Sequence, residues 1–280
     1  MRLFLVVGLW LLCFPWWGEA TTLVEAGIQA LQSQQYARAV EIFSQTIDQA
    51  PALSYGNRCL AYLLLGIYDK AERDCDRALE YLPDNAEVWL DRGLARFHRG
   101  NYPGALADFD RGIALDPHNY RLFYDRALVY SAMGQSHRSL TDYEQALRLS
   151  PPVADRVEIL TDRGIELMLG GQLEGALLDF QQATHLMPSH ARAWFHQGCA
   201  HQRQGELDLA LADFDRVLHL EPENPEAYRA RAIVQKQRGK LRQAVTDLEW
   251  ASFYFQQRGQ QEEYTSVENL KFHWLVRLYV

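Results

Sequence analysis

Six prolines recur at nearly constant intervals along the chain, and this spacing constrains the fold more than any other feature of the sequence. They are Pro51, Pro83, Pro117, Pro151, Pro188 and Pro222, and successive members lie 32, 34, 34, 37 and 34 residues apart. A fixed period of about 20 to 50 residues is typical of repeat proteins, in which each repeat is one supersecondary unit. The sequence is therefore expected to fold as a stack of similar units.

The same residue pattern precedes each proline. Counted from Ala86, the third copy has Trp89, Gly93, Gly100, Tyr102, Ala105, Phe109 and Pro117 at positions 4, 8, 15, 17, 20, 24 and 32. Small residues at positions 8 and 20 allow two helices to approach closely. Glycine at position 15 readily takes the left-handed conformation that ends a helix. Pro103 stands where a second helix should begin, because a first-turn N–H has no helical partner. Each copy is therefore predicted to be two antiparallel helices joined by a short turn.

Seven copies share this register. We assign them to about residues 20–51, 52–85, 86–119, 120–153, 157–190, 191–224 and 225–256. The first copy is weaker, with Gln34 in place of the turn glycine, and the seventh has Gln256 in place of the closing proline. The junction "SPPVADRVEIL" is three residues longer than the others. It predicts a lengthened helix or a slight hinge near Pro151 and Pro152.

The pattern resembles the tetratricopeptide repeat family, and segments such as "DRALVYSAMG" look like those of tetratricopeptide proteins common in cyanobacteria. The resemblance implies an all-α fold, a right-handed superhelical solenoid of seven helix–turn–helix units. It also implies a non-catalytic scaffold for protein–protein interaction. We expect an assembly factor for photosynthetic complexes, or a protein that brings a pigment-synthesis enzyme to thylakoids, with a regulator of envelope assembly as an alternative.

Both ends of the chain depart from the repeat. Residues 1–20 place Arg2 before an apolar run at 3–17 and end in Gly18 and Ala20, the layout of a secretory signal cleaved after Ala20. An uncleaved anchor is the alternative, although the run is shorter than the about 20 residues of a membrane span. We therefore expect an exported protein, in a periplasm or thylakoid lumen, or one anchored by its N-terminus. Membrane contact is expected only through residues 3–17, if they are retained.

Residues 260–280 are predicted to form an amphipathic helix that caps the repeats. Its apolar residues recur every three to four positions: Tyr264, Val267, Leu270, Trp274 and Leu278. A cap should be polar on its outer face, yet "FHWLVRLYV" is apolar on nearly every side. Docking of this helix on a partner or a membrane is therefore the alternative.

The composition excludes several classes of function. The chain has 36 acidic residues against 28 Lys and Arg, a net charge of −8, without a basic cluster, so nucleic-acid binding is not expected. There is no P-loop, no G-x-S-x-G, no H-E-x-x-H and no dinucleotide fingerprint, so neither an enzyme nor a cofactor is expected. His196 and Cys199 could form half of a metal site, and metal-dependent activity there is the alternative. Cys59 and Cys75, at positions 8 and 24 of the second copy, are expected to be buried free thiols, with a disulfide between them as the alternative.

Arginine and aspartate recur at two fixed positions. Position 23 is Asp74, Asp108, Asp142, Asp179, Asp213 and Asp247, and position 7 is Arg58, Arg92, Arg126, Arg163 and Arg231, with Gln197 in the sixth copy. A catalytic pair would occur once. A pair in nearly every copy predicts a structural ion pair, within each hairpin or with the adjacent one.

The family resemblance implies that first helices line a concave groove through positions 2, 5, 6, 9, 12 and 13. The candidate partner-binding residues are Asn57, Leu60, Asp91, Leu94, His98, Tyr124, Asp125, Leu128, Asp162, Ile165, Phe195, His196, Arg229 and Ile233. They combine an apolar stripe with a row of aspartates. We expect the groove to bind a protein or peptide segment with apolar anchors and a basic residue. The alternative is that the aspartates only pair with neighbouring arginines.

Overall fold

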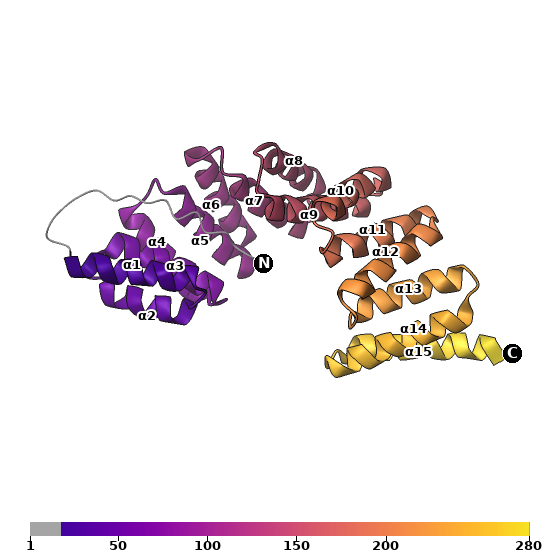
Figure 1. The fold of residues 1–280 in the computed structure, drawn as a ribbon. Coiled ribbons are helices and arrows are strands. Elements are labelled where there is room, and N and C mark those ends of the chain that lie inside the picture. Colours follow the sequence, from indigo (N-terminus) through magenta and orange to yellow (C-terminus); the bar gives the residue numbers. More distant parts are fainter. Residues whose placement is uncertain (1–17, 280) are drawn as a thin grey trace. The chain divides into compact units, whose positions relative to one another are not determined.

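The computed structural model describes residues 18–279, which form 15 helices and no strand. The contacts divide the chain into two compact units, Met1–Gln135 and Ser136–Val280. In each unit the helices follow one another as antiparallel neighbours (Figure 1). The predicted fold class, an all-α solenoid of helix–turn–helix units, is confirmed. The predicted signal or anchor spans residues 1–20, and its residues 1–17 lie outside the described residues. The predicted cleavage point after Ala20 falls in the first turn of α1. None of the helices in the described part combines the length and apolar character needed to cross a membrane.

The first unit contains seven helices within its described residues. They are α1 (Gly18–Gln32), α2 (Tyr36–Thr46), α3 (Pro51–Leu64), α4 (Tyr68–Tyr81), α5 (Ala86–His98), α6 (Tyr102–Leu115) and α7 (Tyr120–Ala132). The first helices of successive repeats, α1, α3, α5 and α7, contact one another directly, whereas the second helices of this unit make far fewer mutual contacts. The first helices therefore form the more closely spaced layer.

The second unit contains eight helices. They are α8 (Ser136–Arg148), α9 (Val153–Leu169), α10 (Leu173–Leu186), α11 (Ala191–Gln204), α12 (Leu207–Leu220), α13 (Pro225–Gln237), α14 (Leu241–Gln257) and α15 (Gln261–Tyr279). Here too the first helices α9, α11 and α13 contact one another in sequence. Helix α9 has 17 residues, so the long junction near Pro151 lengthens this helix as predicted. Helix α14 also has 17 residues, because Gln256 does not end it as a proline would.

Glycine ends the first helix in six repeats, as the sequence predicts. Position 15 has φ between +69° and +82° at Gly66, Gly100, Gly134, Gly171, Gly205 and Gly239. In the first copy Gln34 takes the same left-handed conformation, with φ +60°. Residues with a side chain rarely adopt this conformation, so the turn of the first repeat is more strained than the glycine turns of the other six.

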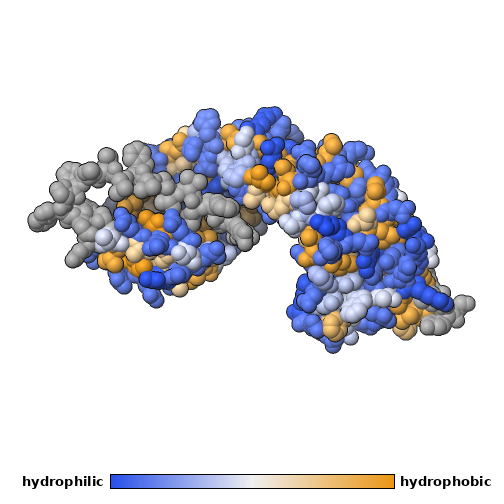
Figure 2. All heavy atoms as spheres, in the orientation of Figure 1, coloured by the Kyte–Doolittle hydropathy of each residue, from blue (hydrophilic) through white to orange (hydrophobic). Residues whose placement is uncertain are grey.

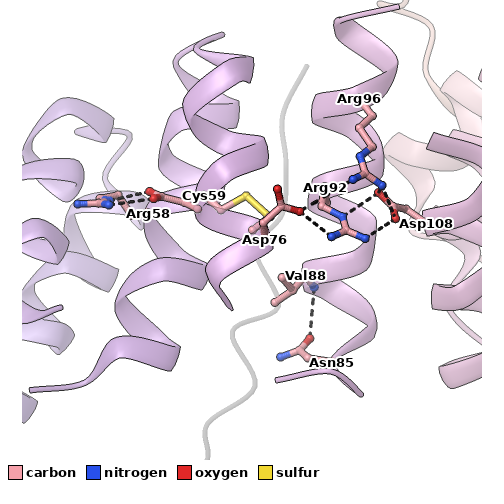
Figure 3. The surroundings of a disulfide bond; sticks show 10 residues. Arg58, Cys59, Asp76, Asn85, Val88, Arg92, Arg96 and Asp108 are labelled. Carbon is pink, nitrogen blue, oxygen red and sulfur yellow. Dashed lines mark hydrogen bonds and ion pairs between the residues drawn. A yellow bond between two sulfur atoms is a disulfide. The ribbon is translucent and has the colours of Figure 1, made fainter. Parts of the chain in front are cut away.

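Positions 8 and 24 meet inside the hairpins of several repeats. A Cβ added to Gly93 would lie 2.5 Å from the Phe109 ring, and one added to Gly198 would lie 2.8 Å from the Phe214 ring. In the second copy the same two positions are Cys59 and Cys75, which form a disulfide with Cα atoms 5.4 Å apart (Figure 3). The prediction of free thiols there is wrong. Two residues of intermediate size replace the glycine–phenylalanine pair, and their backbones are close enough for a disulfide.

Helix α15 packs on α14 through one face. Val267 and Trp274 are buried with Leu248 and Phe255, and the Lys236 ammonium lies 4.5 Å from the centre of the Trp274 ring. On the other side Phe272 is 65% exposed. The helix therefore covers the last repeat and still presents apolar residues to solvent.

Candidate functional site

The recurring arginine and aspartate form bidentate ion pairs inside the hairpins. Arg58 donates to both carboxylate oxygens of Asp74 at 2.6 and 2.8 Å, and Arg231 donates to those of Asp247 at 2.9 and 2.7 Å. The same pairing joins Arg92 to Asp108 and Arg163 to Asp179. The predicted structural role is confirmed for these four pairs, since each joins the two helices of its own repeat.

The same arginines also connect neighbouring repeats. Nη1 of Arg92 donates to Asp76 at 2.7 Å, and Nη1 of Arg231 donates to Asp215 at 2.6 Å, both on the second helix of the preceding repeat. Figure 3 shows the Arg92 guanidinium between Asp76 and Asp108, with the Arg96 guanidinium next to it on the same side of Asp108. Each such arginine therefore holds three helices together.

The sixth copy replaces the arginine by a glutamine and a histidine. The Gln197 amide donates to Asp213 Oδ1 at 2.9 Å, and His201 Nδ1 lies 2.6 Å from Asp213 Oδ2. His201 is buried. The buried aspartate thus keeps two partners without the guanidinium.

The surface with most of the candidate residues is the first-helix face. We define it as positions 2, 5, 6, 9 and 13 of α3, α5 and α7 in the first unit, and of α9, α11 and α13 in the second. Most of its candidate residues are half-buried. Leu94, Ile165 and Ile233 pack against the cores of their own repeats, and Leu60 packs against the core of the first repeat. Position 9 therefore contributes to packing and leaves only part of each side chain exposed.

Two exposed leucines on this face were missed from the sequence. Leu53 at position 2 is 54% exposed and Leu169 at position 13 is 67% exposed. Both positions belong to the expected groove set, so reading them in every copy would have found these residues. In the space-filling view, hydrophobic residues lie scattered among hydrophilic ones on the visible surface (Figure 2).

Two of the predicted aspartates, Asp91 and Asp162, are followed by an arginine at position 2 of the next repeat. Arg192 on α11 pairs with Asp162 and also lies 3.3 Å from Glu158, both on α9. Glu158 is also 3.2 Å from His190 Nε2. The alternative of local pairing is therefore correct for Asp162.

In the first unit the equivalent arginine makes a different contact. Arg121 on α7 donates to Glu87 at 2.9 Å, and the Asn119 amide donates to the same carboxylate at 2.7 Å. Asp91 is 7% exposed and has no hydrogen bond to another described residue. Burial raises the pKa of Asp91 to about 7, although the nearby Arg121 charge favours the ionised form.

Several candidate side chains are engaged within the chain. The Asn57 amide donates to the Leu53 carbonyl, and the Arg229 guanidinium lies 5.7 Å from the centre of the Phe255 ring. His98 is exposed, and its ring stacks on Tyr68 of α4, with centroids 4.5 Å apart. Tyr124, Asp125 and Leu128 are half-buried on α7.

The region of His196 has the character of a core. The His196 ring lies against Phe180 and Phe195, and burial lowers its pKa to about 4. Burial also raises the pKa of the Cys199 thiol to about 11. Within the described residues, no three His, Cys, Asp or Glu side chains are grouped as metal ligands. These observations do not favour the alternative of metal-dependent activity there.

Comparison with known proteins identifies the repeat. Models of the tetratricopeptide repeat match residues 60–119 and 198–270, 161–225, and 120–152. The heat-shock protein cognate co-chaperone sgt12 of Aspergillus fumigatus is 32% identical over 81 residues, 28% of this chain. The matched part spans 24% of that protein's length.

Solved structures show the same fold. A tetratricopeptide repeat protein from Parabacteroides merdae matches 89% of this chain and 98% of its own, with a TM-score of 0.66 and 16% identity. YrrB, described as a tetratricopeptide protein with an unusual peptide-binding site, matches 64% of this chain and 91% of its own, with a TM-score of 0.55 and 22% identity. The chain belongs to the tetratricopeptide repeat family.

Proposed function

We propose that this protein is a binding scaffold that holds a segment of a partner protein on its first-helix face. The observation that carries the proposal is the combination of exposed leucines, half-buried apolar residues and charged residues on that face. Apolar side chains that remain accessible among polar ones favour docking of a partner. The similarity to YrrB, whose description includes a peptide-binding site, supports the same role.

Selection of peptides tests this proposal. Residues 21–280 are immobilised and a phage library of random twelve-residue peptides is selected against them. Leu53→Glu and Leu169→Glu place a charge on the first-helix face, one in each unit. Leu178→Glu and Leu209→Glu are matched controls, because these leucines are 59% and 50% exposed on second helices. We expect selected peptides to lose binding to at least one of the first two variants and to retain it with both controls. Equal binding to all four variants would contradict the proposal.

A narrower role also follows from the sequence resemblance. We propose that the bound partner belongs to a photosynthetic complex or is a pigment-synthesis enzyme, and that this protein acts in its assembly. The test is the amount of assembled pigment–protein complex in cells that lack the gene. Unchanged complexes would overturn this narrower role and leave the binding proposal in place.

We propose further that the chain works in an oxidising compartment. The signal-like residues 1–20 support export, and the disulfide between Cys59 and Cys75 is stable outside a reducing cytosol. Alkylation of free thiols in protein taken directly from cells should modify only Cys199 of these three cysteines. Alkylation of Cys59 and Cys75 as well would contradict this compartment.

A further inference from the structure

The first-helix face contains the same charged arrangement twice, once in each unit. Both copies have glutamate at position 2, aspartate at position 6, and arginine at position 2 of the next repeat. In the second unit these are Glu158, Asp162 and Arg192, and the arginine pairs with both carboxylates. This set is internally satisfied.

The set in the first unit is incomplete. Arg121 donates to Glu87, and Asp91 is left without a hydrogen bond among the described residues. Asp91 belongs to α5 and is more than nine-tenths buried, close to the charged residues Arg121 and Asp125 of α7. The Asp91 oxygens are not among the fully enclosed atoms that lack a partner, so the carboxylate keeps access from the surface. A largely buried carboxyl without a donor from the protein, on a binding face, points to a group supplied by a ligand.

The surroundings of Asp91 select the chemistry of that group. Glu87 and Asp125 add negative potential at this carboxyl, and Arg121 opposes them. A positively charged donor can form a hydrogen bond with the Asp91 carboxylate and is also attracted by the negative potential around it. Guanidinium and ammonium groups on flexible side chains can reach a partly covered carboxylate.

We propose that Asp91 is the subsite for an arginine or lysine side chain of the bound partner segment. This inference rests on the proposed function, because it requires a segment on the first-helix face. It assigns one residue and one ligand chemistry within that face. Asp162 does not take the same role, because Arg192 already occupies it.

The subsite gives binding a characteristic pH dependence. Without a ligand the Asp91 carboxyl is partly protonated at neutral pH, since burial raises its pKa to about 7. A bound cation favours the ionised carboxylate and lowers this pKa, so binding releases a proton. The affinity for a basic segment therefore falls as the pH is lowered from 8 to 6.

The test uses the selected twelve-residue peptides as probes. A peptide with a fixed Arg or Lys is compared with the same peptide carrying norleucine at that position, by fluorescence anisotropy. The proteins are wild type, Asp91→Asn and the control Asp69→Asn, whose side chain is 70% exposed on the second helix α4 of the same unit. We expect norleucine to weaken binding to wild type and to Asp69→Asn by about 10- to 100-fold, the worth of a charge-assisted hydrogen bond. Binding to Asp91→Asn should not distinguish the two peptides. Circular dichroism shows whether each variant is folded.

The outcomes separate this inference from the function on which it rests. Selected peptides without a fixed basic residue, or equal discrimination by Asp91→Asn and wild type, would overturn the Asp91 subsite alone. Failure to select any peptide would overturn the binding face and the subsite together. If Asp91→Asn does not fold, the pH profile with wild type decides. The subsite is supported if the peptide with Arg or Lys loses affinity for wild type between pH 8 and 6 and the norleucine peptide does not. It is overturned if the affinity of the basic peptide does not change with pH.

Discussion

Gly164 lies where helices α9 and α10 approach most closely, and replacing it by alanine tests the packing of the repeat. A Cβ on Gly164 would lie 2.6 Å from Cε1 of Phe180 and 3.0 Å from Cδ1 and Cζ. Carbon atoms in contact normally stay about 3.5–4.0 Å apart, so the ring or the helix must move. Overpacking of this kind costs about 1–3 kcal/mol. Alanine gains about 1 kcal/mol over glycine within a helix. The expected net loss of unfolding free energy is therefore about 0–2 kcal/mol.

Gly56→Ala is the matched control for the helical preference alone. Gly56 lies within α3, and its added Cβ would be 3.8 Å from Val88 Cγ2, an ordinary contact. This variant should gain up to about 1 kcal/mol. The difference between the two alanine variants then isolates the overpacking at Phe180, about 1–3 kcal/mol.

The seventh repeat indicates how the loss can be reversed. It has Ala232 and Leu248 at these two positions, and both are fully buried. Adding Phe180→Leu to Gly164→Ala should restore part of the stability, whereas Phe180→Leu alone leaves a cavity and destabilises. The unfolding free energies of wild type, the three single variants and the double variant are measured by urea unfolding followed by circular dichroism. The reasoning is refuted if Gly164→Ala is as stable as Gly56→Ala, or if Phe180→Leu fails to improve it.

Three further predictions follow from the same contacts. Removing Asp179 should destabilise the protein by about 3 kcal/mol, and a double-mutant cycle with Arg163 should give a coupling above about 1 kcal/mol; a coupling near zero would contradict the structural ion pair. The raised folded-state pKa of Asp91 means that the folded state keeps its proton longer, so the unfolding free energy should fall as the pH rises from about 4 to 7. In Asp91→Asn this fall of the unfolding free energy with pH, measured by denaturant titration at each pH, should disappear. An unchanged fall would show that another group causes it. Replacing Cys59 and Cys75 by serine should destabilise the protein by about 3 kcal/mol, as expected for a short disulfide loop, with the loss of amide protection centred on α3 and α4; unchanged hydrogen exchange there would count against a stabilising disulfide.

The repeat could be predicted because its local rules do not depend on distant contacts. Glycine at position 15 and proline at position 32 set where helices end, and both act through the backbone of one residue. The ion pairs were predictable because recurrence in several copies distinguishes a structural pair from a catalytic one. Helix α14 is longer for the same reason, because Gln256 stands where six other repeats have the proline that ends the unit.

The disulfide was expected only as the alternative to free thiols, because Cys59, Cys75 and Cys199 form an odd and sparse set beyond residues 1–20. A simple antiparallel register also places position 8 opposite position 20, whereas in the structure the residue at position 24 reaches back onto position 8, as Phe109 does on Gly93. Given this contact, Cys59 and Cys75 become obvious partners. The role of the aspartates depended on a contact between repeats, from Arg192 to Asp162, which one hairpin considered alone does not reveal.

Hydrogen exchange with a bound peptide tests the central claim, that a partner segment lies on the first-helix face. The chain is measured with and without a selected twelve-residue peptide, and protection is compared helix by helix. The account predicts added protection in first helices, α3, α5 and α7 or α9, α11 and α13, with little change in the second helices. Protection confined to second helices such as α4, α6, α10 and α12, or to α15, would contradict it.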